Sequence, residues 1–95
     1  MSDYELVTIV SPEVEGEEMP QVVDKVSQFI TGREGTVEGT EQWGRKKLAY
    51  PVKRFLEGSY VLTRFKLEPK LIRELEVDLG AAEEVMRYLV VKVGD

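Results

Sequence analysis

Residues 41–67, EQWGRKKLAYPVKRFLEGSYVLTRFKL, contain the pattern that decides the fold. The segment 59–67 alternates between two sets of side chains, and this alternation predicts a strand with one buried face. One set is Val61, Thr63, Phe65 and Leu67, and the other is Tyr60, Leu62, Arg64 and Lys66. The region 35–52 is typical of a long strand, and FLEG (55–58) of a turn. We therefore expect an antiparallel hairpin.

The first strand of this hairpin has features of a sheet edge. Pro51 cannot donate a hydrogen bond to a neighbouring strand, so the strand is expected at the edge. Gly39 and Gly44 predict bulges or sharp twists within it.

A strand and a helix precede the hairpin. YELVTIVS (4–11) is apolar in both alternating sets, which predicts a central strand covered on both sides. An apolar stripe at helical spacing follows, on a helix expected to begin near Glu17 and to end at Gly32. The stripe consists of Met19, Val22, Val23, Val26, Phe29 and Ile30.

A second helix and a last strand follow the hairpin. Glu68-Pro69 opens the helix, and Gly80 is expected to end it. Residues 85–93, VMRYLVVKV, predict the final strand. The order is βαββαβ, so the expected fold is α+β, a ferredoxin-like split βαβ plan. Its four-stranded antiparallel sheet carries two helices on one face, and residues 1–95 are expected to form a single domain.

Composition excludes several classes of function. The chain has no cysteine, which rules out thiolate metal sites and disulfides, and no histidine, which removes the commonest general base. We therefore expect no enzyme, no metal and no cofactor. No segment is apolar enough to span a membrane, and the acidic N-terminus predicts no signal peptide. The absence of cysteine fits a cytoplasmic location.

Charge is distributed unevenly along the chain, whose net charge is −5. Residues 1–42 hold ten acids and two bases, whereas residues 43–95 hold eleven bases and eight acids. The bases Arg45, Lys46, Lys47, Lys53 and Arg54 lie close together with no acid among them. Such a run either binds RNA phosphates or protects an edge strand against aggregation. Trp43, beside it, is expected to be a packing residue.

The segment WGRKKLAYPVK (43–53) resembles the signature of the bacterial small-subunit ribosomal protein six family. Three further segments agree with that family in order and spacing: Tyr4-Glu5, Gly58-Ser59-Tyr60-Val61 and Arg87-Tyr88-Leu89-Val90-Val91-Lys92. The resemblance covers essentially the whole chain. Lys46 and Lys47 stand where arginines are frequent in the family, so phosphate contact is favoured over specific base contact.

The resemblance implies a structural part of the small (30S) subunit, located on the cytoplasmic ribosome. It implies binding to the central domain of 16S rRNA together with ribosomal protein eighteen, a basic partner that an acidic surface complements. The RNA-binding residues expected from it and from the charge pattern are Arg45, Lys46, Lys47, Tyr50, Lys53, Arg54 and Arg87. The open sheet face, a candidate partner surface, is expected to carry Val7, Ile9, Tyr60, Leu62, Leu89 and Val91.

Two alternatives stay open beside this reading. The same fold serves small-molecule-binding regulatory domains, but the acidic loops SPEVEGEEMP and GAAEE would repel a phosphate-bearing ligand. A small acyl-phosphate hydrolase would need an arginine in the loop after the first strand, where the chain has Ser11-Pro12-Glu13.

Arg87 fits either a surface salt bridge or a contact with RNA or partner.

Overall fold

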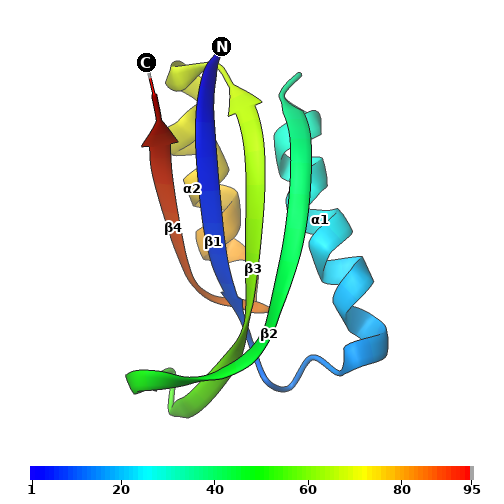
Figure 1. Ribbon diagram of the computed structural model, residues 1–95, viewed down its shortest axis with the longest axis vertical. Helices are drawn as coiled ribbons and strands as arrows, with labels where there is room; N and C mark the ends of the chain where they lie inside the picture. The colour runs from blue at the N-terminus through cyan, green and yellow to red at the C-terminus, as the bar shows by residue number, and fades with distance from the viewer. Residues whose placement is uncertain (95) are drawn as a thin grey trace.

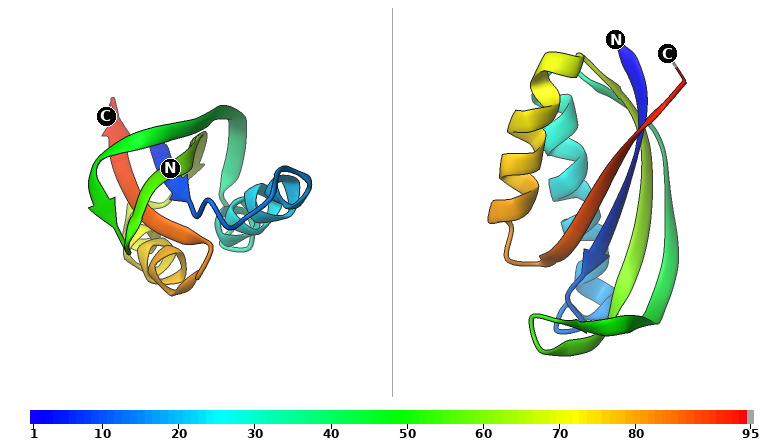
Figure 2. Two further views of the ribbon diagram at one scale, coloured as in Figure 1. Left: turned by 90° about the horizontal axis from the view of Figure 1, so that it is seen from below. Right: turned by 90° about the vertical axis from the view of Figure 1, so that its left-hand side faces the viewer.

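A computed structural model describes residues 1–94, with the elements in the expected order. The strands are β1 (Ser2–Val10), β2 (Thr36–Val52), β3 (Phe55–Leu67) and β4 (Val85–Val93), and the helices are α1 (Met19–Thr31) and α2 (Ile72–Ala81). All strand pairs are antiparallel, in the order β2-β3-β1-β4. Both helices cover one face of the sheet (Figures 1 and 2). The predicted split βαβ plan is therefore confirmed, although Asp95 lies outside the described residues.

The core lies between the sheet and the helices. Tyr4, Leu6 and Val10 of β1 point into it, and the Tyr4 ring stacks on Phe65 of β3 with centroids 5.4 Å apart. The helix α1 contributes the expected apolar stripe, with Val22, Val26 and Ile30 buried, and α2 contributes the buried Leu75 and Leu79. Burying each such side chain contributes about 1.5–3 kcal/mol. The expectation that β1 is covered on both sides is wrong, because within residues 1–94 both helices lie on one face of the sheet and none covers the other, where Val7 is only half-buried.

Both helix boundaries differ slightly from the predicted ones. The α-helix α1 begins at Met19 rather than near Glu17, because a single 3-10 turn, Gly16–Glu18, precedes it. Glu15 and Glu18 form a capping box across that turn. Gly32 caps α1 as predicted, but α2 continues through Gly80 to Ala81. The amide of Ala82 still donates to the carbonyls of Asp78 and Leu79, which extends the last turn.

The strand β2 lies at the sheet edge and is bulged near Gly39 and Gly44, as predicted. The turn of the hairpin was predicted wrongly at 55–58. It lies at Lys53 and Arg54, which both adopt positive φ, at 49° and 67°, and join Val52 directly to its partner Phe55. Two successive left-handed residues match the twist of a hairpin, even though lysine and arginine rarely adopt that conformation.

Gly58 is consequently a strand residue rather than a turn residue. A Cβ at this position would lie 2.6 Å from Ile9 Cγ2, 2.8 Å from Met86 Cε and 3.1 Å from the Val10 carbonyl oxygen. The absence of a side chain therefore lets β3 pass close to the end of β1 and the beginning of β4. Beyond this crossing, the distal part of the hairpin bends beneath the sheet (Figure 1).

We predict that Gly58→Ala lowers the free energy of unfolding by about 1–3 kcal/mol, because the added methyl group overpacks this crossing. Gly39→Ala is the matched control, since a Cβ there meets nothing within 4 Å. Urea unfolding of both variants measures the difference. Equal stability of the two variants would show that the crossing accommodates a side chain.

Candidate functional site

The distal β2–β3 hairpin, residues 45–57, is the most basic part of the structure. We call it the hairpin tip. It bends beneath the end of the sheet where β4 begins (Figure 1). Lys46, Lys47, Lys53 and Arg54 are all exposed on it. Among residues 1–94, these four side chains take part in no ion pair, so their charges remain available to an external anion.

Arg45, in contrast, has partners within the protein, although its side chain is exposed. Its Nη1 lies 3.2 Å from Glu57 Oε1 across the hairpin, and its Nη2 donates to the carbonyl oxygen of Pro12 at 3.0 Å. These contacts tie the hairpin tip to the loop that follows β1. Of the basic run recognised in the sequence, Arg45 is thus the member that positions the tip.

Arg87 and Tyr50, both predicted RNA-binding residues, contact each other. Arg87 Nη1 donates to the Tyr50 hydroxyl, and the guanidinium carbon lies 5.4 Å from the centre of the Tyr50 ring. The hydrogen bond to Tyr50 raises the pKa of Arg87 above its ordinary value. The contact joins the hairpin tip to β4. Among residues 1–94 Arg87 forms no salt bridge, and its contact with RNA or a partner stays a prediction.

The expectation that Trp43 packs inside the protein is wrong. Its side chain is 44% exposed, and its indole Nε1–H donates to Glu41 Oε1 at 3.3 Å. Lys46 Nζ lies 5.6 Å from the ring centre. Glu41 is in turn bound to Arg64, with Nη1 and Oε2 2.6 Å apart, and this contact lowers the pKa of Glu41 below its ordinary range. The sequence signal of this exposure is the pair of charged residues two positions to either side, Glu41 and Arg45.

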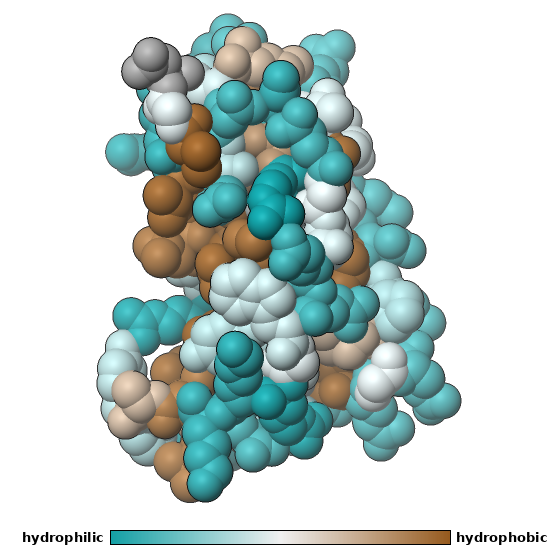
Figure 3. Space-filling model, viewed as in Figure 1, coloured by the Kyte–Doolittle hydropathy of each residue, from teal (hydrophilic) through white to brown (hydrophobic). Residues whose placement is uncertain are grey.

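A groove of about 280 Å³ crosses the open sheet face. It is lined by Val7, Ile9, Tyr60, Arg87, Tyr88 and Leu89. Four of the six residues predicted for this surface therefore come together. Tyr88 also borders the groove, but its side chain packs against the core on the helix side of the sheet. Apolar atoms gather along the β4 side of this face (Figure 3), where Leu89 is 60% exposed and Val91 is 44% exposed.

Leu62 is the exception among the predicted open-face residues. It lies on the open side of β3, but only 6% of its surface is exposed, so its side chain is not available to a partner. Beyond it toward the start of β1, salt bridges cross the sheet. Arg64 contacts Glu5 as well as Glu41, and Lys66 lies 3.8 Å from Asp3. These charges bound the apolar surface on one side.

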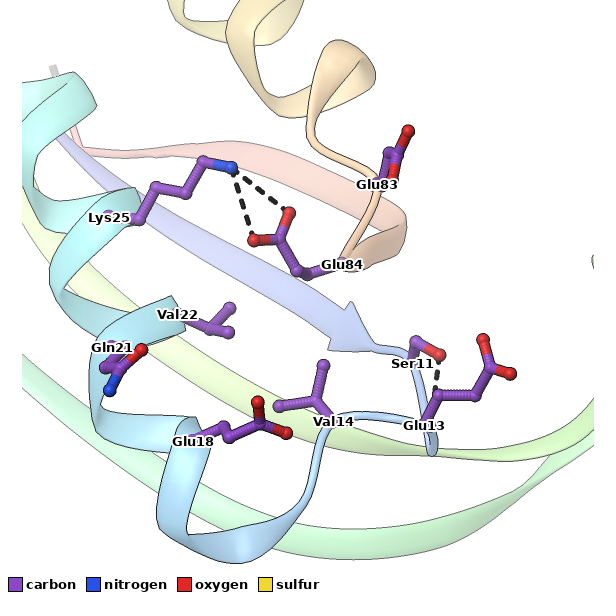
Figure 4. Close-up of a pocket in the computed structure, with 9 residues that line it drawn as sticks. All are labelled: Ser11, Glu13, Val14, Glu18, Gln21, Val22, Lys25, Glu83 and Glu84. Atoms are coloured by element: carbon purple, nitrogen blue, oxygen red, sulfur yellow. Dashed lines mark hydrogen bonds and ion pairs between the residues drawn. The ribbon is translucent and has the colours of Figure 1, made fainter.

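A hollow of about 480 Å³ lies at the opposite side of the molecule, between the start of α1 and the segment before β4 (Figure 4). Glu13, Glu18, Glu83 and Glu84 line it, and Lys25 binds Glu84 at 3.1 Å. The described residues contain no group of acids arranged to hold a metal ion. None of the helices in residues 1–94 is long and apolar enough to cross a membrane.

The fold defines the class of the protein as a ferredoxin-like α+β domain, here with a basic hairpin tip and an apolar surface on the open face of its sheet. Comparison with known proteins assigns the family. The model of the family described as ribosomal protein S6 matches residues 3–92. The chain belongs to this family, and it therefore has a structural, non-enzymatic role in the small subunit of the cytoplasmic bacterial ribosome.

Individual relatives agree over nearly their whole length. The small ribosomal subunit protein bS6 of Moorella thermoacetica is 41% identical over 98% of this chain and 95% of the relative. That of Fusobacterium nucleatum is 40% identical, over 97% and 98%. The crystal structure of 30S ribosomal protein S6 from Thermotoga maritima superposes with a TM-score of 0.90, at 30% identity, over 97% of this chain and 87% of that one.

We predict that Glu84→Gln lowers stability at neutral pH by less than about 1 kcal/mol, because it removes an exposed ion pair with Lys25. The pKa of Glu84 is lowered first by a backbone hydrogen bond and then by Lys25. A lowered folded-state pKa stabilises the protein above the ordinary carboxyl pKa, and this contribution disappears as the pH falls through the lowered value. The difference between wild type and variant should therefore vanish in acid.

Urea unfolding at neutral pH and at about pH 3 tests this expectation, since that range spans an ordinary carboxyl pKa. Glu83→Gln is the matched control, because Glu83 is adjacent in sequence but has no ion pair among residues 1–94. A Glu84→Gln variant whose stability differs from wild type equally at both pH values would contradict the assigned role.

Proposed function

We propose that this chain binds 16S rRNA through the hairpin tip and docks ribosomal protein eighteen on its open sheet face. The single observation that supports the RNA site best is the cluster of exposed, unpaired cations on the tip. Phosphates are neutralised by four side chains of the tip, Lys46, Lys47, Lys53 and Arg54. Arg45 positions the tip through its contact with Pro12. The contact between Tyr50 and Arg87 completes the RNA-binding surface. Residues 1–95 act as a single domain in this role.

The binding is electrostatic in its first step. Lysine and arginine side chains that neutralise phosphates release condensed counterions, and affinity then falls steeply with salt. The net charge of −5 opposes this attraction over the rest of the surface. We therefore expect the isolated chain to bind RNA weakly at physiological salt and to need its basic partner for tight binding.

The partner surface consists of the groove and the adjoining side of β4. Val7, Ile9, Tyr60 and Leu89 line the groove, and Val91 continues the exposed apolar surface along β4. Exposed apolar side chains on one strand of an uncovered sheet face are typical of a protein interface. A basic partner seated there also meets a chain whose acids outnumber its bases.

We predict that Lys46→Ala with Lys47→Ala weakens binding to a central-domain rRNA fragment and flattens its salt dependence. Each lost phosphate contact reduces the slope of log K against log salt by about 0.7–0.9, so the pair should reduce it by about 1.5. Lys70→Ala with Arg73→Ala is the control, since it removes two exposed charges from the helix side. A slope that changes equally in both double variants would place the RNA site elsewhere.

A second prediction concerns the partner surface. Leu89→Lys should weaken binding of ribosomal protein eighteen at least about tenfold, because it places a charge in an apolar contact and repels a basic protein. Val77→Lys is the matched control, since Val77 is 65% exposed but lies on α2, on the other side of the molecule. Titration calorimetry measures both affinities. Equal weakening by the two lysines would exclude the open face as the docking surface.

A further inference from the structure

Two aromatic rings on β2 are exposed in the basic part of the molecule. Trp43 is 44% exposed and Tyr50 is 55% exposed, and Lys46 and Lys47 lie between them in the sequence. Pairing with β3 is interrupted between Lys47 and Val52, so Tyr50 projects from a segment that makes no regular ladder with its neighbour. Aromatic side chains of this size are normally buried, so the exposure of both rings indicates a role other than packing.

Each ring is held in a fixed orientation by polar contacts. The Trp43 indole donates to Glu41, which Arg64 holds in place, and Lys46 lies over the ring. Tyr50 receives a hydrogen bond from Arg87, whose guanidinium also lies over its ring. In both cases a cation lies on one side of the ring. The opposite side is the one that a flat ligand can approach, and the ring does not have to be ordered when the ligand binds.

We propose that Trp43 and Tyr50 stack unpaired nucleobases, so that the RNA bound by this chain is a single-stranded loop, bulge or junction rather than a regular duplex. This inference rests on the proposed RNA-binding function and names the kind of RNA that the same site takes. Bases in a duplex are already stacked on each other and cannot reach an aromatic ring, whereas splayed bases can. The free lysines beside the rings neutralise the backbone of the same nucleotides.

The surroundings favour a nucleobase over an apolar protein segment as the occupant. Trp43 lies on β2, at the opposite edge of the sheet from the exposed apolar side chains of β4, Leu89, Val91 and Val93. Tyr50 does reach β4, where it meets the charged Arg87. Three charged residues contact the two rings: Glu41, Lys46 and Arg87. A cation on one face of a ring and a base on the other form a sandwich that also matches the negative charge of RNA.

The test uses the full chain, alone at low salt and in complex with ribosomal protein eighteen. The probes are a 2-aminopurine-labelled single-stranded RNA and a duplex of the same length. We expect the single strand to bind more tightly and its fluorescence to be quenched by stacking. Trp43→Leu and Tyr50→Leu should each weaken binding about 5- to 100-fold without changing the salt slope. Trp43→Phe and Tyr50→Phe, which keep a ring, should stay within a few-fold of wild type.

Leu56→Ala is the matched control, because Leu56 is an exposed apolar residue of the same hairpin tip without an aromatic face. It should leave RNA binding nearly unchanged, and thermal unfolding verifies that every variant is folded. Unchanged affinity in both leucine variants, with a normal salt slope, would overturn the stacking site while leaving phosphate binding intact. The stacking site would also be overturned if the leucine variants lost affinity for ribosomal protein eighteen but kept their affinity for RNA. Absence of any salt-dependent RNA binding would instead remove the proposed function itself.

Discussion

Burial of Phe65 against Leu6 and the two helices is the constraint on which the two binding surfaces depend. Phe65, Leu6, Ile30 and Leu75 are completely buried in one cluster, which fixes the face of β3 and β1 that meets the helices. Side chains alternate along a strand with a period of two, so the next residues must point to the open side. A slip of one residue would bury Arg64 and expose Phe65, and the cost of burying an unpaired arginine makes that register inaccessible.

This one-sided burial also determines where free charge can lie. On the open face, Arg64 and Lys66 of β3 are neutralised by acids of β1 and β2, which leaves no net positive field over the middle of the sheet. The hairpin tip extends below the ends of β1 and β4 (Figure 1), and these acids, Asp3, Glu5, Glu38 and Glu41, lie outside it in the sequence. An acidic protein can therefore present cations to RNA, because the acids and the free lysines are separated in space as well as in sequence.

Most of the fold could be predicted from the sequence, because it depends on periodicity and on Gly and Pro. Alternation in 59–67, the helical stripe of α1 and Pro51 at the sheet edge each have one local cause. The hairpin turn could not be predicted, because Lys53 and Arg54 adopt left-handed conformations that their residue types do not signal. The same holds for contacts between distant residues. Two such contacts depend on how far the tip bends beneath the sheet: that of Arg45 with Pro12 and that of Arg87 with Tyr50.

Arg87 links the two proposed surfaces, since it lines the open-face groove and also holds Tyr50 on the hairpin tip. A group that binds in the groove and draws Arg87 toward itself necessarily removes a hydrogen bond and a cation from Tyr50. By linkage, RNA that uses Tyr50 must then alter the affinity of the groove for its occupant by the same factor. The contact is exposed, and such hydrogen bonds contribute about 1 kcal/mol, so this coupling is limited to roughly a factor of five. Stronger cooperation between RNA and partner would therefore require direct contact between the two ligands, which the position of the tip below the open face permits.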